Sequence, residues 1–147
     1  MAIVREQIYA ALWRIVSEAA PFATANRRLR HWADVSPPEQ PALFMSQKRQ
    51  RGATHQGGVN LPVVWTLYAD FYIYVHSSDP ALSPAMLLNP LIDAVELSLA
   101  PNVGTGIQDL GLPQMVKHTR LLGEIETAEG VLGDQELAII PVEILCV

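Results

Sequence analysis

Residues 62–76, PVVWTLYADFYIYVH, alternate between two kinds of side chain along their whole length. Because successive side chains of a β-strand point to opposite faces, this alternation predicts one long strand. A straight strand of this length measures about 45 Å, whereas a compact domain of this size is roughly 40 Å across, so we expect the strand to bend or to protrude. One face is apolar and must lie on a core; it comprises Val63, Trp65, Leu67, Ala69, Phe71, Ile73 and Val75.

The other face of this strand carries three tyrosines, Tyr68, Tyr72 and Tyr74. A tyrosine joins an apolar ring to a hydroxyl that forms hydrogen bonds, and this combination is common at protein interfaces. Two interpretations fit the pattern. The tyrosine face is either a surface for a partner or a surface roofed by a helix of the same chain.

Two helices are predicted from apolar residues at helical spacing. The first lies within residues 2–20 and ends before Pro21. The second begins after Ser83, which can cap it, with Pro84 at the first helical position. Pro90 leaves two alternatives open, because a proline inside a helix either kinks it or begins a second, shorter helix.

Four further strands are predicted at residues 27–34, 42–47, 114–127 and 133–147. The short connection between the last two predicts an antiparallel hairpin. The elements then follow the order α-β-β-β-α-β-β. Residues 1–147 therefore form a single domain of α+β class, with an antiparallel or mixed β-sheet of about five strands and two main helices packed on it.

The final strand is apolar on both faces, and it contains Pro141. Proline lacks the backbone N–H that a strand pairing needs, which predicts an edge strand or a bulge. An edge strand that is apolar on both faces is an aggregation hazard unless something covers it. We therefore expect a neighbouring copy of the chain to cover this strand.

Charge is unevenly distributed along the chain, whose net charge is −5. Residues 1–51 contain eight Lys and Arg against four Asp and Glu, whereas residues 52–147 contain two against eleven. Glycines and cations at 48–58 predict a flexible basic loop at about 46–61. Opposite charges on the two parts suit head-to-tail contact between copies, in which the basic loop of one copy contacts the acidic hairpin (residues 114–147) of the next. The residues predicted at such a subunit or partner interface are Arg28, Arg30, Lys48, Arg49, Arg51, Tyr68, Tyr72, Tyr74, Glu124, Glu126, Glu129 and Asp134.

Signatures of catalysis are not found in the sequence. The four histidines are far apart, the single Cys146 has no partner for a zinc site, and the glycines of GTGIQDLG have the wrong spacing for a dinucleotide loop. We expect no enzyme activity, no cofactor and no metal. The N-terminal residues do not resemble a secretory signal, and no apolar run reaches the roughly 20 residues of a membrane helix, so we expect production in the cytoplasm and no membrane contact.

Four stretches together resemble the bacteriophage tail terminator proteins, also called tail completion proteins. They are residues 26–45, 61–80, 87–101 and 123–146. The resemblance implies a virion protein of the tail or neck, made in the host bacterial cytoplasm. It implies a ring, usually a hexamer, that caps the tail tube, ends tube polymerisation and docks the head-tail connector or stopper protein. Genomic DNA would pass through the lumen without specific recognition.

Other functions fit parts of the same pattern. One is another neck or minor tail protein, such as a head-tail adaptor. A second is a single-strand nucleic-acid-binding protein that uses Trp32 and the arginines, although a pI near 5.2 opposes it.

For the ring of the tail terminator interpretation we expect a neutral or acidic lumen, because a strongly basic channel would retain DNA.

Overall fold

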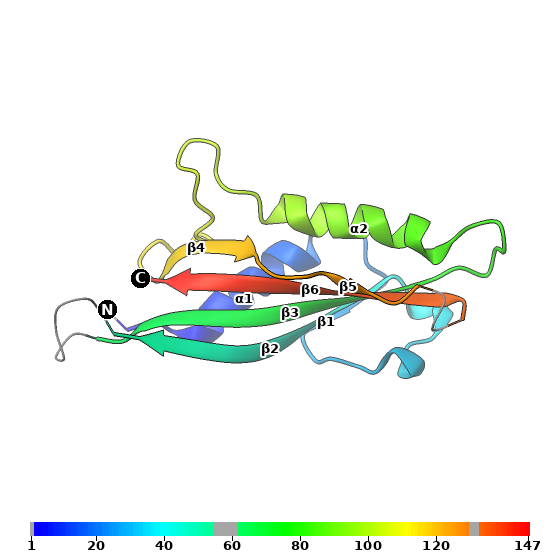
Figure 1. Ribbon diagram of the computed structural model, residues 1–147, viewed down its shortest axis with the longest axis horizontal. Coiled ribbons are helices and arrows are strands. Elements are labelled where there is room, and N and C mark those ends of the chain that lie inside the picture. Colours follow the sequence, from blue (N-terminus) through cyan, green and yellow to red (C-terminus); the bar gives the residue numbers. More distant parts are fainter. Residues whose placement is uncertain (1, 55–61, 130–132) are drawn as a thin grey trace.

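The long strand predicted at 62–76 is confirmed and lies in the middle of the sheet. In the computed structural model, which describes residues 2–54, 62–129 and 133–147, β3 (Val64–His76) pairs antiparallel with β2 on one side and β6 on the other (Figure 1). The sheet order is β1-β2-β3-β6-β4, and β5 also pairs with β6. The other strands are β1 (Thr24–Asn26), β2 (Ala42–Ala53), β4 (Val116–Leu121), β5 (Glu126–Thr127) and β6 (Gln135–Cys146).

The predicted α+β class is confirmed as two helices with a six-strand mixed sheet. β1 runs parallel to β2, and the other described strand pairs are antiparallel. The strands run along the longest axis of the molecule (Figure 1). The elongated shape thus accommodates the length of β3.

Both helices pack on one face of the sheet. In α1 (Arg5–Ser17) the residues Ile8 and Leu12 are fully buried, and in α2 (Pro84–Ser98) so is Leu88. These side chains share one core with the apolar face of β3. Among the residues with a described structure, no helix is long and apolar enough to cross a membrane.

The two alternatives at Pro90 are resolved in favour of one helix. α2 continues through Pro90, whose ring lies on the exposed side. The predicted cap is confirmed, because the Ser83 hydroxyl accepts a hydrogen bond from the Ala85 N–H at 3.3 Å. Pro84 occupies the first turn, as expected.

The strand predicted at 27–34 is wrong. The strand β1 ends at Asn26, and Trp32–Asp34 and Pro37–Glu39 form short 3-10 helices instead. Residues 27–40 fold over one end of the sheet, on the face away from α1 and α2. There Trp32 and Val35 pack against Phe44 and Tyr74, so this tertiary contact overrides the local alternation that suggested a strand.

The prediction that the final strand is an edge strand is also wrong. β6 pairs with β3 along one side and with β4 and β5 along the other. Pro141 lies between the two short partners, where Leu121 pairs with Val142 and Glu126 pairs with Ile139. The pairing on both sides makes β6 an inner strand, and its residues Ala138, Ile140, Val142 and Ile144 lie in the core shared with the helices.

The predicted loop at 46–61 must be corrected at its start. β2 continues to Ala53, so Lys48, Arg49 and Arg51 lie in a strand. Gly52 has a packing role, since a Cβ there would lie 2.8 Å from Cγ1 of Val63. Residues 55–61, which include the rest of the predicted loop, lie outside the described residues.

Candidate functional site

A bulge in β2 gathers cations on the sheet face that the helices leave uncovered. Gln47 pairs with Ala69 and Gln50 pairs with Leu67, so Lys48 and Arg49 together stand opposite the single residue Tyr68. In a regular strand two consecutive side chains point to opposite faces. The extra residue of a bulge breaks this alternation.

Both cations contact the tyrosine face of β3. The Lys48 Nζ lies 3.4 Å from the Tyr72 hydroxyl and 3.5 Å from Oδ2 of Asp70. The Arg49 guanidinium lies over the Tyr68 ring, 4.5 Å from its centroid. The hydrogen bond to Tyr72, together with the Asp70 carboxylate, raises the pKa of Lys48. Lys48 is thus held in its charged form.

Alternation resumes after the bulge and brings a third cation to the same face. Gln50 points toward the helices, where its side-chain oxygen accepts a hydrogen bond from Arg5 at 2.5 Å. Arg51 pairs with Thr66, so its exposed side chain lies on the face of Tyr68. We call the uncovered surface that carries Lys48, Arg49 and Arg51 the basic face.

A partly buried ion pair adjoins the basic face. Arg120 of β4 contacts the Glu143 carboxylate of β6 at 3.0 Å, and the Glu143 side chain is only 8% exposed. Glu143 pairs with Tyr68 in the sheet, which places this ion pair directly beside the cations. A hollow of about 480 Å³ lies between them, and its lining includes Lys48, Arg49, Tyr68, Leu122, Pro141 and Glu143.

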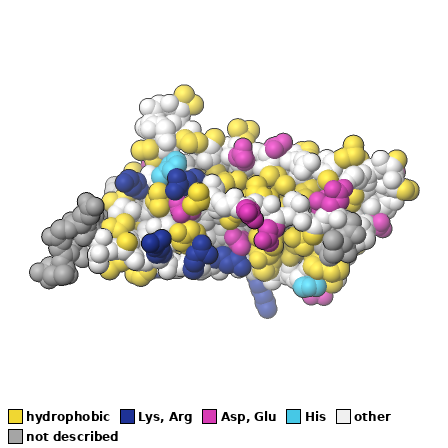
Figure 2. All heavy atoms as spheres, viewed as in Figure 1, with side chains coloured by type: hydrophobic (Ala, Val, Ile, Leu, Met, Phe, Trp, Pro, Cys, Tyr) yellow, Lys and Arg dark blue, Asp and Glu magenta, His cyan; other side chains and the backbone are white. Residues whose placement is uncertain are grey.

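Charge on this surface is not balanced locally. Lys48, Arg49, Arg51 and Arg120 supply four positive charges, and the carboxylates of Asp70 and Glu143 supply two negative ones. Figure 2 shows the sheet face turned away from α1, with Lys and Arg gathered toward one end and most acidic side chains toward the other. Such a surface can bind an acidic protein surface or a polyanion.

The predicted acidic residues lie toward the opposite end. Glu124, Glu126, Glu129 and Asp134 are all exposed. Glu126 pairs with Ile139 of β6, which places it on the uncovered face. Glu129 accepts a hydrogen bond from the Ser83 hydroxyl at the start of α2.

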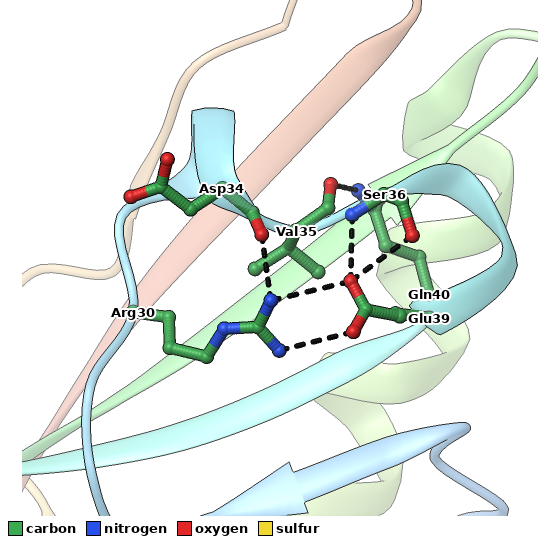
Figure 3. Close-up of polar contacts among 6 residues, drawn as sticks. All are labelled: Arg30, Asp34, Val35, Ser36, Glu39 and Gln40. Atoms are coloured by element: carbon green, nitrogen blue, oxygen red, sulfur yellow. Dashed lines mark hydrogen bonds and ion pairs between the residues drawn. The ribbon is translucent and has the colours of Figure 1, made fainter.

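Arg30 is engaged within its own segment (Figure 3). Its guanidinium donates to the Glu39 carboxylate at 3.2 and 3.3 Å and to the Asp34 carbonyl at 2.6 Å. Glu39 also accepts from the N–H and the hydroxyl of Ser36. The hydrogen bonds from Arg30 and then from Ser36 lower the pKa of Glu39 to about 2.

The three tyrosines have different environments. Tyr68 and Tyr72 are partly exposed on the basic face, whereas Tyr74 is only 4% exposed. Its hydroxyl donates to the Arg30 carbonyl at 2.6 Å, and burial raises the pKa of Tyr74 to about 12. A roof from the same chain therefore covers Tyr74; it is the segment 27–40, with its two short 3-10 helices, and neither α1 nor α2. Arg28 is exposed, outside the basic face.

Sequence reasoning missed Asp70, Glu143 and Arg120. The alternation of β3 already placed Asp70 on the face of Tyr68 and Tyr72, so this residue was identifiable. The ion pair between Arg120 and Glu143 depends on β4 lying beside β6, a pairing across 23 positions that local patterns do not fix. Glu136 of β6 is only 2% exposed, and burial followed by repulsion from Glu129 raises its pKa.

Within the described residues, no group of three or more His, Cys, Asp or Glu side chains could hold a metal ion. No protein-family model matches the chain, and no curated protein matches it either.

Proposed function

We propose that this chain is a structural protein of a bacteriophage tail, of the terminator kind. In this role, copies of the chain form a ring on the last ring of the tail tube, end its polymerisation and provide the docking surface for the head-tail connector. The basic face is the observation that carries the proposal. A chain with net charge −5 gathers three cations on one uncovered surface, and most of the acidic side chains seen on that face lie toward its other end.

This charge distribution supports contact between copies. A ring requires two different, complementary patches on each subunit. The basic face offers one of them, and the exposed carboxylates Glu124, Glu126 and Asp134 offer the other. The resemblance of the four sequence stretches to tail terminators supplies the identity of the ring.

Two charge-reversed variants test the contact between the two patches. One variant carries Lys48→Glu, Arg49→Glu and Arg51→Glu, and a second carries Glu124→Lys, Glu126→Lys and Asp134→Lys. Each alone has patches of one sign and should fail to form rings. Mixed together, they present opposite patches to each other and should recover rings of even subunit number.

The function itself is tested with purified tail tube protein. Light scattering gives the mass of the free chain, and electron microscopy gives the length distribution of the tubes that polymerise in its presence. We expect rings at tube ends and shorter tubes. Tubes of unchanged length without a terminal ring, at a large excess of the chain, would contradict the proposal.

Single-strand nucleic-acid binding is the second candidate, because cations lie beside Tyr68 and Tyr72 on an open sheet face. However, the Arg49 guanidinium covers the face of the Tyr68 ring on which a base would stack. Binding to a short DNA strand at low salt, with steep loss of affinity as salt rises, would favour this candidate over the ring.

A further inference from the structure

The hollow on the uncovered face exists because the sheet is open at Pro141. Along β6, β4 ends opposite Val142 and β5 begins opposite Ile139, so the two residues between them have no strand partner on this side within the described part of the chain. Proline has no backbone N–H to pair, which suits Pro141 to such a gap. The connecting chain turns away at Gly123, whose φ of 114° favours glycine, and leaves a hollow of about 480 Å³.

Apolar groups form one wall of this hollow. Pro141 pairs with Asp70, which places its ring on the uncovered face of the sheet. Leu122 lies beside it, with its N–H 3.3 Å from the Pro141 carbonyl oxygen, and its side chain is 47% exposed. An occupant that covers Leu122 with an apolar group of its own would remove this surface from water, which favours binding.

The rim of the hollow carries a cation that has no carboxylate. Lys48 lies 3.5 Å from Asp70, and Arg120 lies 3.0 Å from Glu143. Both carboxylates of the lining therefore already have a cation. Among the described residues, no carboxylate lies within ion-pair distance of Arg49. Its guanidinium is held over a tyrosine ring, and a guanidinium in this position still has N–H groups that can hold a carboxylate at two points.

Arg49 and Arg120 stand at the two ends of one row across the sheet. The order across the four strands is Arg49, Tyr68, Glu143 and Arg120. Three strand spacings of ~4.8 Å separate the two arginines by roughly 14 Å. The Arg120 side chain is 48% exposed, so it keeps N–H groups for a further carboxylate. In an extended chain, residues i and i+4 share one face at a distance of about 13 Å, with residue i+2 between them.

We propose that the hollow binds an extended acidic segment of a partner protein. Carboxylates at positions i and i+4 of the segment contact Arg49 and Arg120. An apolar side chain at position i+2 covers Leu122 and Pro141. This inference goes beyond the contact between copies in a ring, because its occupant belongs to another protein.

A partner protein supplies this pattern better than the other candidates do. In the sequence no two Asp or Glu residues lie four positions apart, so a copy of this chain cannot present the pattern in one extended segment. A nucleic acid has no side chain for Leu122, and its phosphates would approach Asp70 and Glu143 in the lining of the hollow. Arg49 also covers the Tyr68 ring on which a base would stack.

The test titrates the isotope-labelled chain with the peptide ESLSE and follows backbone amide signals by NMR. Acetylated and amidated ends remove the terminal charges of the peptide. Signals of Tyr68, Leu122 and Gly123 should shift, whereas signals of α2 on the other face should not. The peptide SELES has the same composition but places its glutamates two positions apart, and it should bind more weakly. The peptides QSLSQ and ESSSE remove the charges and the apolar group in turn.

Two variants of the chain show which groups touch the peptide. Leu122→Ser should weaken the binding of ESLSE about fivefold and leave that of ESSSE unchanged. Arg49→Gln should weaken the binding of ESLSE and leave that of QSLSQ unchanged. Leu97→Ser, at a position of α2 that is 75% exposed, and Arg14→Gln, on the exposed side of α1, are the matched controls and should bind ESLSE like the unmodified chain.

Each outcome decides for or against the inference. Losses that depend on the matching group of the peptide, together with weaker binding of SELES, support it. Equal binding of ESLSE and SELES, or no binding of either, overturns it. A thymidine oligonucleotide that shifts the same amide signals at lower concentration than ESLSE, without any response to Leu122→Ser, would show a surface for nucleic acid and also overturn it. Ring formation is measured without the peptide, so the proposed function stands or falls separately.

Discussion

Lys48 and Arg49 are consecutive residues of β2, yet both side chains lie on the same face of the sheet. Lys48 reaches Tyr72 and Asp70, and Arg49 covers the ring of Tyr68. The bulge opposite Tyr68 is the cause, because it places two residues where a regular strand has one. A bulge and a lysine are also common devices against unwanted pairing at an exposed strand edge. The structure thus favours side-chain contact with a partner over the addition of a strand.

Charge reversal at Lys48, Arg49 and Arg51 should weaken assembly and leave the fold intact. The three side chains are exposed and belong to a strand edge outside the main core. Ring formation or tube capping, measured by light scattering and electron microscopy, should fall steeply. Arg14→Glu, on the exposed side of α1, is compared with Arg49→Glu as a single-charge control and should assemble normally. Loss of the circular dichroism signal in the triple variant would show that these residues support the fold.

Phe71→Ala should destabilise the chain by about 3–5 kcal/mol, because its ring is fully buried between the sheet and the helices. Trp65→Ala should lower the free energy of unfolding by less, about 2 kcal/mol, because Trp65 is partly exposed. The Arg5 guanidinium carbon lies 4.7 Å from the centroid of its ring. Urea unfolding at neutral pH compares the two variants. An equal or reversed order would mean that the core is centred nearer to Trp65.

Acid should remove a stabilising contact of Glu39. The pKa of this carboxyl is about 2 in the folded chain, against an ordinary value of 4.5. A lowered pKa in the folded state means that the contribution is complete above pH 4.5 and is lost as the pH falls toward 2. Glu39→Gln should show no such loss. Urea midpoints of both chains, measured between pH 7 and pH 2, should converge at the acid end of this range.

Glu136 should behave in the opposite sense. Burial and the neighbouring Glu129 raise its pKa, so the folded chain binds this proton more tightly than the unfolded chain does. Its unfavourable contribution is present at neutral pH and disappears as the pH falls to 4.5. We expect Glu136→Gln to melt at a higher temperature than the unmodified chain at pH 7, with no difference below pH 4.5. A lower melting temperature at pH 7 would indicate that the ionised carboxylate has a favourable partner.

The elements defined by local spacing could be predicted from the sequence. The alternation of β3, the periodicity of α1 and the Ser83–Pro84 start of α2 each depend on a few neighbouring residues. The central place of β6 could not be predicted, because its apolar faces and Pro141 fit an edge strand equally well until its partners are known. What decides the matter is the pairing with β3, which is remote in sequence.

The candidate site could be predicted only in part. The charge imbalance identified Lys48, Arg49 and Arg51, and the alternation of β3 identified Tyr68 and Tyr72. The bulge that brings these groups together has no local signal, since Lys48 and Arg49 read as ordinary strand or loop residues. Arg30 and Tyr74 were grouped with them on residue type, but the fold of residues 27–40 joins these two to each other instead.

The central position of β6 has a consequence for the time course of folding. β2 and β3 form a local hairpin, in which Ala53 pairs with Val64. The contacts of β3 with β6 join residues as far apart as Thr66 and Leu145, so a long loop must close before they form. Chains rich in such distant contacts fold slowly. One edge of β3 therefore stays unpaired until β6 is added, and an unpaired strand edge of this kind is where a newly made chain is prone to aggregate.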